Sequence, residues 1–182
     1  MSIRRIVTRH DAEGRSIFAE DAPARRSHDY EHIKGFSTSL VWSTEGVPEV
    51  PNEGMDPTQD VNSFVPKPGD TRFMIVTFPP DSVMMSETFN SSAAGQEYMD
   101  NIPGLAETFE IDNPGMHTTD SVDYGIVLDG EISLELDDGK EVDLKRYDTV
   151  IQNGTRHGWR NKSDKPATLA FVLIGAERVK KP

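Results

Sequence analysis

The sequence contains no cysteine, no long apolar run and only a modest number of basic residues. Without cysteine the chain can form no disulfide, no thiolate metal site and no cysteine nucleophile. No run of apolar residues is long enough to cross a bilayer. The start of the chain, MSIRRIVTRHDAEG, is basic but lacks the apolar core of a signal peptide. We therefore expect a cytoplasmic protein with no membrane partner.

Positive charge is outnumbered by negative charge. The chain has 19 Lys and Arg residues against 31 Asp and Glu residues, which gives a formal net charge of −12. Binding to nucleic acid needs a basic face, and the basic residues of this chain are scattered. Nucleic acid is therefore not an expected partner, and we attribute the acidity to solubility.

The first 70 residues contain short β-like runs followed by a turn-rich segment. The stretch at 44–70 is rich in proline and glycine, which favours a loop that wraps the surface or covers a pocket. The total of 182 residues suits one structural domain. We expect residues 1–70 to form an N-terminal arm and covering loop packed on a barrel at 71–182. The β-like runs of the arm are 3–7, 15–20 and 37–42.

From residue 72 onward, short apolar runs are mostly separated by turn signals. The run RFMIVTF at 72–78 is a strand candidate that ends at two prolines. The Asp-Asp-Gly triplet at 137–139 is a strong hairpin signal. Many short strands with turns between them predict an all-β sandwich or barrel. The later expected strands are 122–128, 131–136, 141–145, 148–152, 155–161 and 167–175.

The segment at 83–112 differs in character from the β-like runs. It is richer in helix formers around 93–109, and Pro103 interrupts it. The alternatives are one or two short helical turns or a disordered insertion. Because methionine side chains adapt to varied surfaces, we predict that this segment is a mobile cover over the barrel mouth. Its large apolar residues include Met84, Met85, Phe89, Met99 and Phe109.

Two of the five histidines, His117 and His157, are candidates for chemistry. Side chains of a strand alternate between its two faces. If both segments are extended, His117 shares a face with Thr119 and Asp123, and His157 shares a face with Trp159. Inside a closed barrel these faces can meet. Two imidazoles and one carboxylate would then converge, which is a donor set that suits Fe(II), Mn(II), Zn(II) or Ni(II).

The other three histidines lie in the polar N-terminal region. His28 and His32 have the i, i+4 spacing of a helical metal site, but two ligands without a third make a weak site. For these two and for His10 we expect surface or structural roles.

The segment from Gly115 to Gly130 resembles the first motif of the cupin family. That motif has His-x-His, a Glu after a short gap, and a Gly that ends the strand. His117 and Gly130 match the first His and the terminal Gly. Thr119 stands in place of the second His, and Asp123 stands in place of the Glu.

A second segment, which begins at Tyr147, resembles the second cupin motif. Gly154, His157 and Asn161 fall on the Gly, His and Asn of the family. Tyr147 itself takes the place of the opening Gly, and Gln152 takes the place of the usual Pro.

The resemblance implies a cupin, or jelly-roll, β-barrel with an N-terminal β arm and a short helical insertion. It also implies that His117, Asp123 and His157 bind a divalent metal ion and carry the catalysis. Because one His is lost and the Glu is shortened to Asp, the alternative is a metal-free site. The same residues would then serve acid–base chemistry or ligand binding.

As function, the resemblance implies a metal-dependent enzyme that acts on a small organic molecule, aromatic or polyketide-like. The reaction would be that of a dioxygenase or of a lyase, dehydratase or isomerase. Thr119, Gln152 and Trp159 are the expected substrate-binding residues, although core packing is the more common role of an inward aromatic residue such as Trp159. The alternative function is a non-catalytic small-molecule-binding cupin without a metal. A storage protein is disfavoured by the single barrel and the polar site residues.

The strand expected at 122–128 is apolar on both faces. Tyr124 has the opposite parity to Asp123 and so points outward, as do Ile126 and Leu128. A strand with this pattern is normally covered on both sides. The N-terminal strands or a second subunit would have to supply the cover, and we expect a homodimer.

Overall fold

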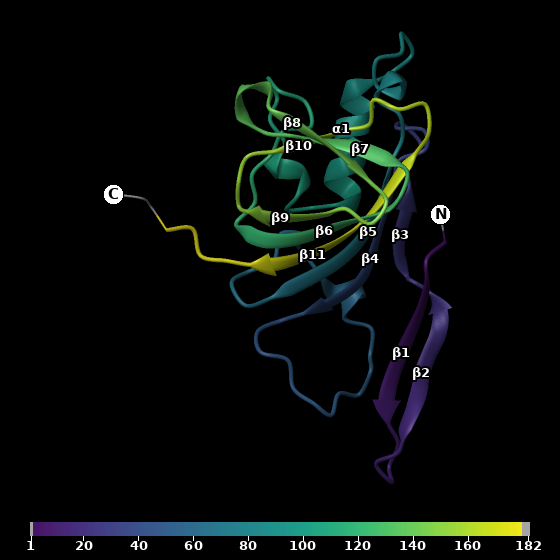
Figure 1. The fold of residues 1–182 in the computed structure, drawn as a ribbon. Helices are drawn as coiled ribbons and strands as arrows, with labels where there is room; N and C mark the ends of the chain where they lie inside the picture. Colours follow the sequence, from purple (N-terminus) through teal and green to yellow (C-terminus); the bar gives the residue numbers. More distant parts are fainter. Residues whose placement is uncertain (1, 180–182) are drawn as a thin grey trace.

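The computed structural model describes residues 2–179, which form a β-barrel with an N-terminal hairpin projecting from it (Figure 1). One sheet has six strands in the order β3-β4-β5-β11-β6-β9, a second has three in the order β10-β7-β8, and β1 pairs with β2. Every pairing is antiparallel. The strands are β1 (Arg4–His10), β2 (Ser16–Pro23), β3 (Arg26–Asp29), β4 (Ser37–Thr44), β5 (Thr71–Phe78), β6 (Ser121–Asp129), β7 (Glu131–Glu135), β8 (Glu141–Lys145), β9 (Thr149–Asn153), β10 (Gly158–Arg160) and β11 (Ala167–Gly175).

The two sheets of the barrel pack on each other through their inward side chains. Val127 of β6 and Leu169 of β11 come from the large sheet, and Ile132, Leu134 and Leu144 come from the small one. All five are at least 90% buried and belong to one cluster. The predicted all-β jelly-roll barrel is therefore confirmed.

The large sheet begins earlier in the chain than the predicted boundary at residue 71. Strand β4 pairs with β5 from Ser37 to Thr44, and β3 pairs with β4. Strands β3 and β4, which lie before residue 45, therefore belong to the barrel itself. The charged composition around Arg26 concealed β3, because an edge strand tolerates polar side chains on both faces.

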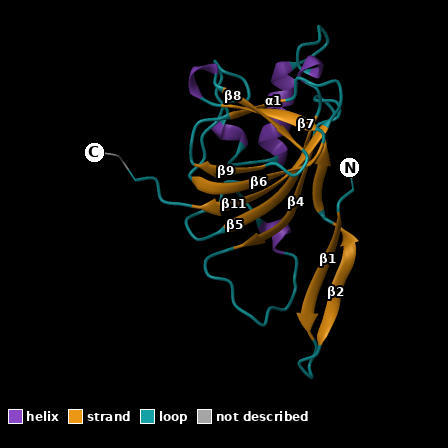
Figure 2. Cartoon of the chain, viewed as in Figure 1, coloured by secondary structure: helices purple, strands orange, loops and turns teal. Residues whose placement is uncertain are grey.

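The helical insertion lies between β5 and β6, at one end of the barrel (Figure 2). Helix α1 (Ser91–Asn101) begins at Asn90, whose side chain accepts a hydrogen bond from the backbone N–H of Ala93. It ends just before Pro103, since proline cannot continue a helix. The 3₁₀ turns are η1 (Pro57–Asp60), η2 (Asp81–Val83), η3 (Ala106–Thr108) and η4 (Asp137–Gly139). Within residues 2–179 no helix is long and apolar enough to span a membrane.

The insertion is a packed part of the fold. Its residues Ala94, Ile102 and Ala106 are buried in the same cluster as Tyr30 and Phe36. The carboxylate of Glu97 accepts hydrogen bonds from the backbone N–H groups of residues 31 and 32, at 2.8 and 2.9 Å. The segment covers the barrel mouth as predicted, but its packing is that of core structure, which argues against a loose flap.

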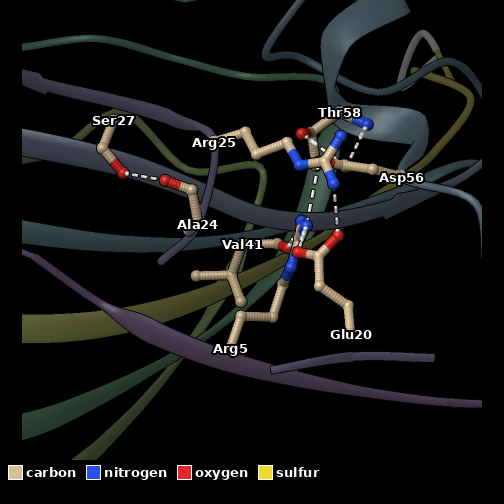
Figure 3. Close-up of polar contacts among 8 residues, drawn as sticks. All are labelled: Arg5, Glu20, Ala24, Arg25, Ser27, Val41, Asp56 and Thr58. Atoms are coloured by element: carbon tan, nitrogen blue, oxygen red, sulfur yellow. Dashed lines mark hydrogen bonds and ion pairs between the residues drawn. The ribbon is translucent and has the colours of Figure 1, made fainter. Parts of the chain in front are cut away.

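The projecting hairpin β1–β2 is tied to the barrel by a buried ion-pair network (Figure 3). Arg5 Nη2 lies 2.5 Å from Glu20 Oε1 and 2.9 Å from Asp56 Oδ2, while its Nη1 donates to the carbonyl of Val41 at 3.1 Å. The side chains of Arg5 and Asp56 are only 4% and 5% exposed. Burial alone would raise the pKa of Asp56, but hydrogen bonds from Arg5 and Thr58 outweigh it and lower the pKa to about 2.

We expect Asp56→Ala to lower the free energy of unfolding by about 3 kcal/mol, because it leaves a buried guanidinium with one carboxylate instead of two. Chemical denaturation followed by circular dichroism measures this loss. The matched control is Arg4→Ala, which removes the exposed pair between Arg4 and Asp21 and should leave the midpoint nearly unchanged. Equal effects of the two variants would contradict the assigned role of Asp56.

Candidate active site

The barrel interior contains a cavity of about 750 Å³. Strands β5, β6, β9, β10 and β11 contribute inward side chains, and the insertion between β5 and β6 closes the opposite side. The predicted site residues His117, Thr119, Asp123, Gln152, His157 and Trp159 all line it. Apolar side chains form most of the remaining wall, and the aromatic ones are Phe36, Phe78, Phe89, Tyr98, Phe109 and Phe171.

His117 and His157 are held side by side by their own backbones. The N–H of each residue donates to the carbonyl of the other, at 2.9 Å in both directions. Residues paired in this way project their side chains to the same face. The two ring centroids are 4.2 Å apart, and both residues are more than 90% buried. The predicted convergence of the two imidazoles is therefore observed.

Backbone carbonyls fix which ring nitrogen carries the proton. The Nδ1 atom of His117 lies 3.1 Å from the carbonyl oxygen of Gly115, and that of His157 lies 2.9 Å from the carbonyl oxygen of Thr155. A carbonyl only accepts, so Nδ1 is the donor and Nε2 of the neutral ring is the acceptor. Burial, reinforced by the neighbouring His157, lowers the pKa of His117 to about 4. Burial also lowers the pKa of His157. Both rings are neutral at neutral pH.

Asp123 is a buried carboxyl with few hydrogen bonds to offset the loss of water. It is 6% exposed, and its Oδ1 has no hydrogen-bond partner within the described part of the chain. Burial raises its pKa to about 6, and the nearby Ser121 hydroxyl offsets this only in part. That hydroxyl also bonds Thr119 Oγ1 at 2.9 Å. The carboxyl therefore exchanges its proton close to neutral pH.

Gln152 stands next to Asp123 on the adjoining strand, since the two residues are register partners of β9 and β6. Its Oε1 accepts a hydrogen bond from Thr155 Oγ1 at 3.1 Å. Its Nε2 is buried and, among residues 2–179, has no partner. One acceptor on Asp123 and one donor on Gln152 are thus left unpaired at the same part of the cavity wall.

We expect Asp123→Asn to stabilise the fold at pH 8 by about 3 kcal/mol. The figure comes from the pKa of Asp123, which burial raises from 3.8 in the unfolded chain to about 6 in the folded protein. Between these two pH values the folded protein keeps the proton of Asp123, whereas the unfolded chain has lost it. Stability therefore falls as pH rises from about 4 to about 6, and the amide removes this loss. Denaturation midpoints at pH 8 and pH 4 measure it, and the gain should vanish at pH 4. The exposed Asp112→Asn is the control; an Asp123→Asn gain that is equal at both pH values would contradict the ionisation argument.

Ion pairs fasten the end of the insertion to the barrel rim. Arg156 contacts both carboxylate oxygens of Glu110, at 2.6 and 2.7 Å. Arg160 contacts Glu135 at 2.5 Å and donates to the carbonyl of Pro114 at 2.9 Å. These contacts hold the chain just before His117 and so help to position that imidazole.

Trp159 serves as both cavity wall and core. Its ring stands perpendicular to that of His157 at 6.0 Å and lies 5.4 Å from Phe171. The aromatic wall beyond Trp159 was not predicted. The inward parity of Phe78 in β5 and of Phe171 in β11 is the sequence signal that identifies two of its members.

The three expected metal ligands do not form a compact group in the structure. Each imidazole is suited to a metal, because a backbone carbonyl orients it through Nδ1. Within residues 2–179, however, no group of three His, Cys, Asp or Glu side chains could hold a metal ion. The metal ion expected at His117, Asp123 and His157 therefore stays a prediction.

The N-terminal histidines have the surface and structural positions expected of them. His10 and His32 are exposed. His28 Nε2 lies 2.8 Å from Glu97 Oε1, and so belongs to the contacts that anchor α1.

Residues 110–174 match the sequence model of the Cupin domain family. This part of the chain is a cupin domain. The matched residues run from the end of the insertion through β6 to β11, so they include both imidazoles and Asp123 of this cupin.

Relatives of this cupin occur in fungi. Phomopsin biosynthesis cluster protein C' of Diaporthe leptostromiformis is 49% identical over 65 residues, which cover 35% of this chain and 34% of that protein. The match thus spans about a third of that relative's length. Oryzines biosynthesis cluster protein J of Aspergillus oryzae is 29% identical over 178 residues, covering 97% of this chain and 85% of that protein. Cupin-domain-containing oxidoreductase fogC of Aspergillus ruber is 25% identical over 178 residues, covering 96% and 73%.

Proposed function

We propose that this cupin is an enzyme that binds a small, largely apolar organic molecule in the barrel and moves protons on it. The observation that carries the proposal is the grouping of two neutral imidazoles, a carboxyl that titrates near pH 6 and an unpaired amide in one apolar cavity. Titratable groups whose pKa values are displaced in a cavity are typical of catalytic sites. The biosynthesis-cluster names of two relatives support a small organic substrate.

The polar residues point to a substrate that carries a carbonyl or hydroxyl group. Asp123 Oδ1 and Gln152 Nε2 are an acceptor and a donor without partners. Each buried unpaired polar atom costs about 1–3 kcal/mol. A hydroxyl, enol or carbonyl oxygen of the substrate would relieve both costs, while its apolar part packs against the aromatic wall.

The reaction follows from the protonation states. An Nε2 atom of His117 or His157 accepts a proton from the carbon beside the substrate carbonyl, and the bonding electron pair moves toward the carbonyl oxygen. That oxygen accepts a hydrogen bond from Gln152 or the proton of Asp123. Return of the proton at another carbon gives an isomer, and expulsion of a leaving group gives the product of a lyase or dehydratase.

The experiment uses 4-phenylbutan-2-one as a probe, because its α-protons exchange slowly without a catalyst. We expect the protein to speed the exchange of these protons for deuterium in D₂O at least 100-fold over buffer, followed by proton NMR. The rate should survive treatment with EDTA. Binding of the probe without exchange would favour the non-catalytic binding protein, and neither binding nor exchange would overturn the proposal.

An oxidative reaction is the second candidate, and the name of the Aspergillus ruber relative favours it. A dioxygenase of this kind needs a metal such as Fe(II), and the residues present do not form the expected centre. Oxygen uptake with added Fe(II) and the same probe distinguishes the candidates. Exchange that continues without oxygen supports proton transfer, whereas turnover only with both oxygen and Fe(II) would establish the oxidative reaction.

A further inference from the structure

The two segments that carry the site residues lose their backbone pairing beside the cavity. Strands β6 and β9 pair as far as Val122 and Asn153, and the next pair along the chain is that of the two site histidines. Between these pairings, within the part of the chain that the structure describes, residues 118–120 share no backbone hydrogen bond with residues 154–156. Backbone carbonyls in such a gap need donors from elsewhere.

Arg178, in the tail that follows β11, supplies these donors. Its Nη2 donates to the carbonyl oxygen of Thr119 at 2.9 Å and to that of Gly154 at 3.2 Å. Its Nε pairs with the carboxylate of Asp120. The packing is close, because a Cβ added to Gly154 would lie 3.2 Å from the Thr119 carbonyl oxygen and 3.3 Å from Arg178 Nη2. One guanidinium group therefore joins the two segments across the gap.

Strand β11 delivers the tail to this position. Gly175, at the end of β11, is the register partner of Ser121 in β6. The N–H of Ala176 then donates to the carbonyl of Asp120 at 2.9 Å. Arg178 follows two residues later, with its side chain 49% exposed. It lies beyond the residues that match the family, so the motifs of the family do not identify it.

The carbonyl of Gly154 is next in the chain to contacts that orient the site. The following residue is Thr155, whose carbonyl accepts a hydrogen bond from Nδ1 of His157 at 2.9 Å. The hydroxyl of Thr155 donates to the side chain of Gln152 at 3.1 Å. A shift of this turn would therefore move both an imidazole and the unpaired amide.

The carbonyl of Thr119 lies between the other two site groups. Thr119 lines the cavity and is 2% exposed. Its Oγ1 accepts a hydrogen bond at 2.9 Å from the hydroxyl of Ser121, which is close to Asp123. His117 precedes Thr119 by two residues. A shift of this backbone would move the His117 ring relative to the Asp123 carboxyl.

We propose that Arg178 is a positioning residue, which holds the segment of His117 at a fixed distance from the segment of His157. Arginine suits this role because its planar guanidinium donates in several fixed directions at once. The expected effect on rate rests on the proposed proton transfer. That transfer needs a short contact between the base and the substrate carbon, and a misplacement of about 1 Å can cost about 100-fold in rate.

Arg178→Ala tests the proposal through the kinetics of deuterium exchange of 4-phenylbutan-2-one. We expect kcat to fall by about 10- to 100-fold, with KM within about twofold of the wild type, because the apolar wall that binds the probe is intact. Arg178→Lys should have an intermediate kcat, since an ammonium group keeps the charge but not the fork of donors. The control is Arg15→Ala, which removes an exposed pair with Asp11 and should leave both constants unchanged.

The ring N–H signals of the two site histidines give a readout that does not depend on turnover. In the wild type, Nδ1–H of each ring is bonded to a backbone carbonyl, so its signal in ¹H–¹⁵N NMR should be protected from exchange with water. In Arg178→Ala the signals of His117 and His157 should shift and exchange faster. In Arg15→Ala they should stay as in the wild type.

Loss of kcat together with displaced ring signals supports the positioning role. If kcat or the ring signals of Arg178→Ala match the wild type, the proposal is overturned, even if the variant is less stable. If Arg178→Ala does not fold, Arg178→Lys decides the matter by the same two measurements. A wild-type protein without exchange activity would overturn the proposed function, and the ring signals alone would then decide the role of Arg178.

Discussion

His157→Gln should slow deuterium exchange of the ketone probe by about 10²- to 10⁴-fold, the usual contribution of a general base. The amide can still pair with the Thr155 carbonyl but cannot accept a proton from carbon at neutral pH. His117→Gln tests which of the two rings is the base, because the one that accepts the proton shows the larger loss. The initial exchange rate, measured by NMR with the fold checked by circular dichroism, gives the result.

The pH profile adds a readout that a structural defect would not reproduce. The base acts when neutral, which for His117 holds above about pH 4. The acid acts when protonated, which for Asp123 holds below about pH 6. The rate should therefore rise through pH 4 and fall through pH 6, and Asp123→Asn should abolish the fall. His28→Gln, outside the cavity, should keep the full rate. If His117→Gln and His157→Gln each retain more than a tenth of it, neither imidazole is the base and the proposed role is contradicted.

Gly175→Ala should destabilise the fold by about 3 kcal/mol or more, the upper range for overpacking against fixed atoms. A Cβ at this position would lie 1.8 Å from the carbonyl oxygen of Lys67, which is a backbone atom. The loop cannot retreat, because Gly69 N–H donates to the Gly175 carbonyl and Gly175 N–H donates to the Asp70 carbonyl. The midpoint of urea unfolding measures the loss.

Gly95→Ala is the matched control for this substitution. Gly95 lies inside α1, and an added Cβ meets nothing within 4 Å. Alanine is the better helix former by about 1 kcal/mol, so this variant should be more stable than the wild type. The same chemical change thus has opposite signs at two positions. A Gly175→Ala protein as stable as the wild type would show that the loop before β5 is not fixed.

Most of the barrel could be predicted because its strands carry local signals. Alternating apolar residues and the turn at 137–139 predicted β6 to β8, and the prolines after Phe78 predicted the end of β5. β3 was missed, since four polar residues at a sheet edge have no periodic signal of their own. The packing of the insertion was also missed. Ala94, Tyr98 and Ile102 have the i, i+4 spacing of one helix face, but only the tertiary structure shows that this face packs into the core.

The site was predicted as far as strand parity reaches. Parity correctly places His117, Asp123 and His157 toward the same cavity. It does not give distances, and so it could not show that the three fail to form a compact donor group. The residues of the insertion that close the cavity were predicted only as a segment, because no parity rule relates a helix to a strand far along the chain.

The unpaired carboxyl of Asp123 also affects which substitutions are expected at this position during evolution. Most substitutions in a folded protein lower its stability. Substitutions that raise it can reduce activity, because active sites often contain destabilising groups that the reaction needs. In a duplicated gene whose product is no longer needed for activity, replacement of Asp123 by a neutral residue would be favoured because it raises stability. Paralogues that have lost the activity should therefore lose this carboxyl early, while the barrel around it persists.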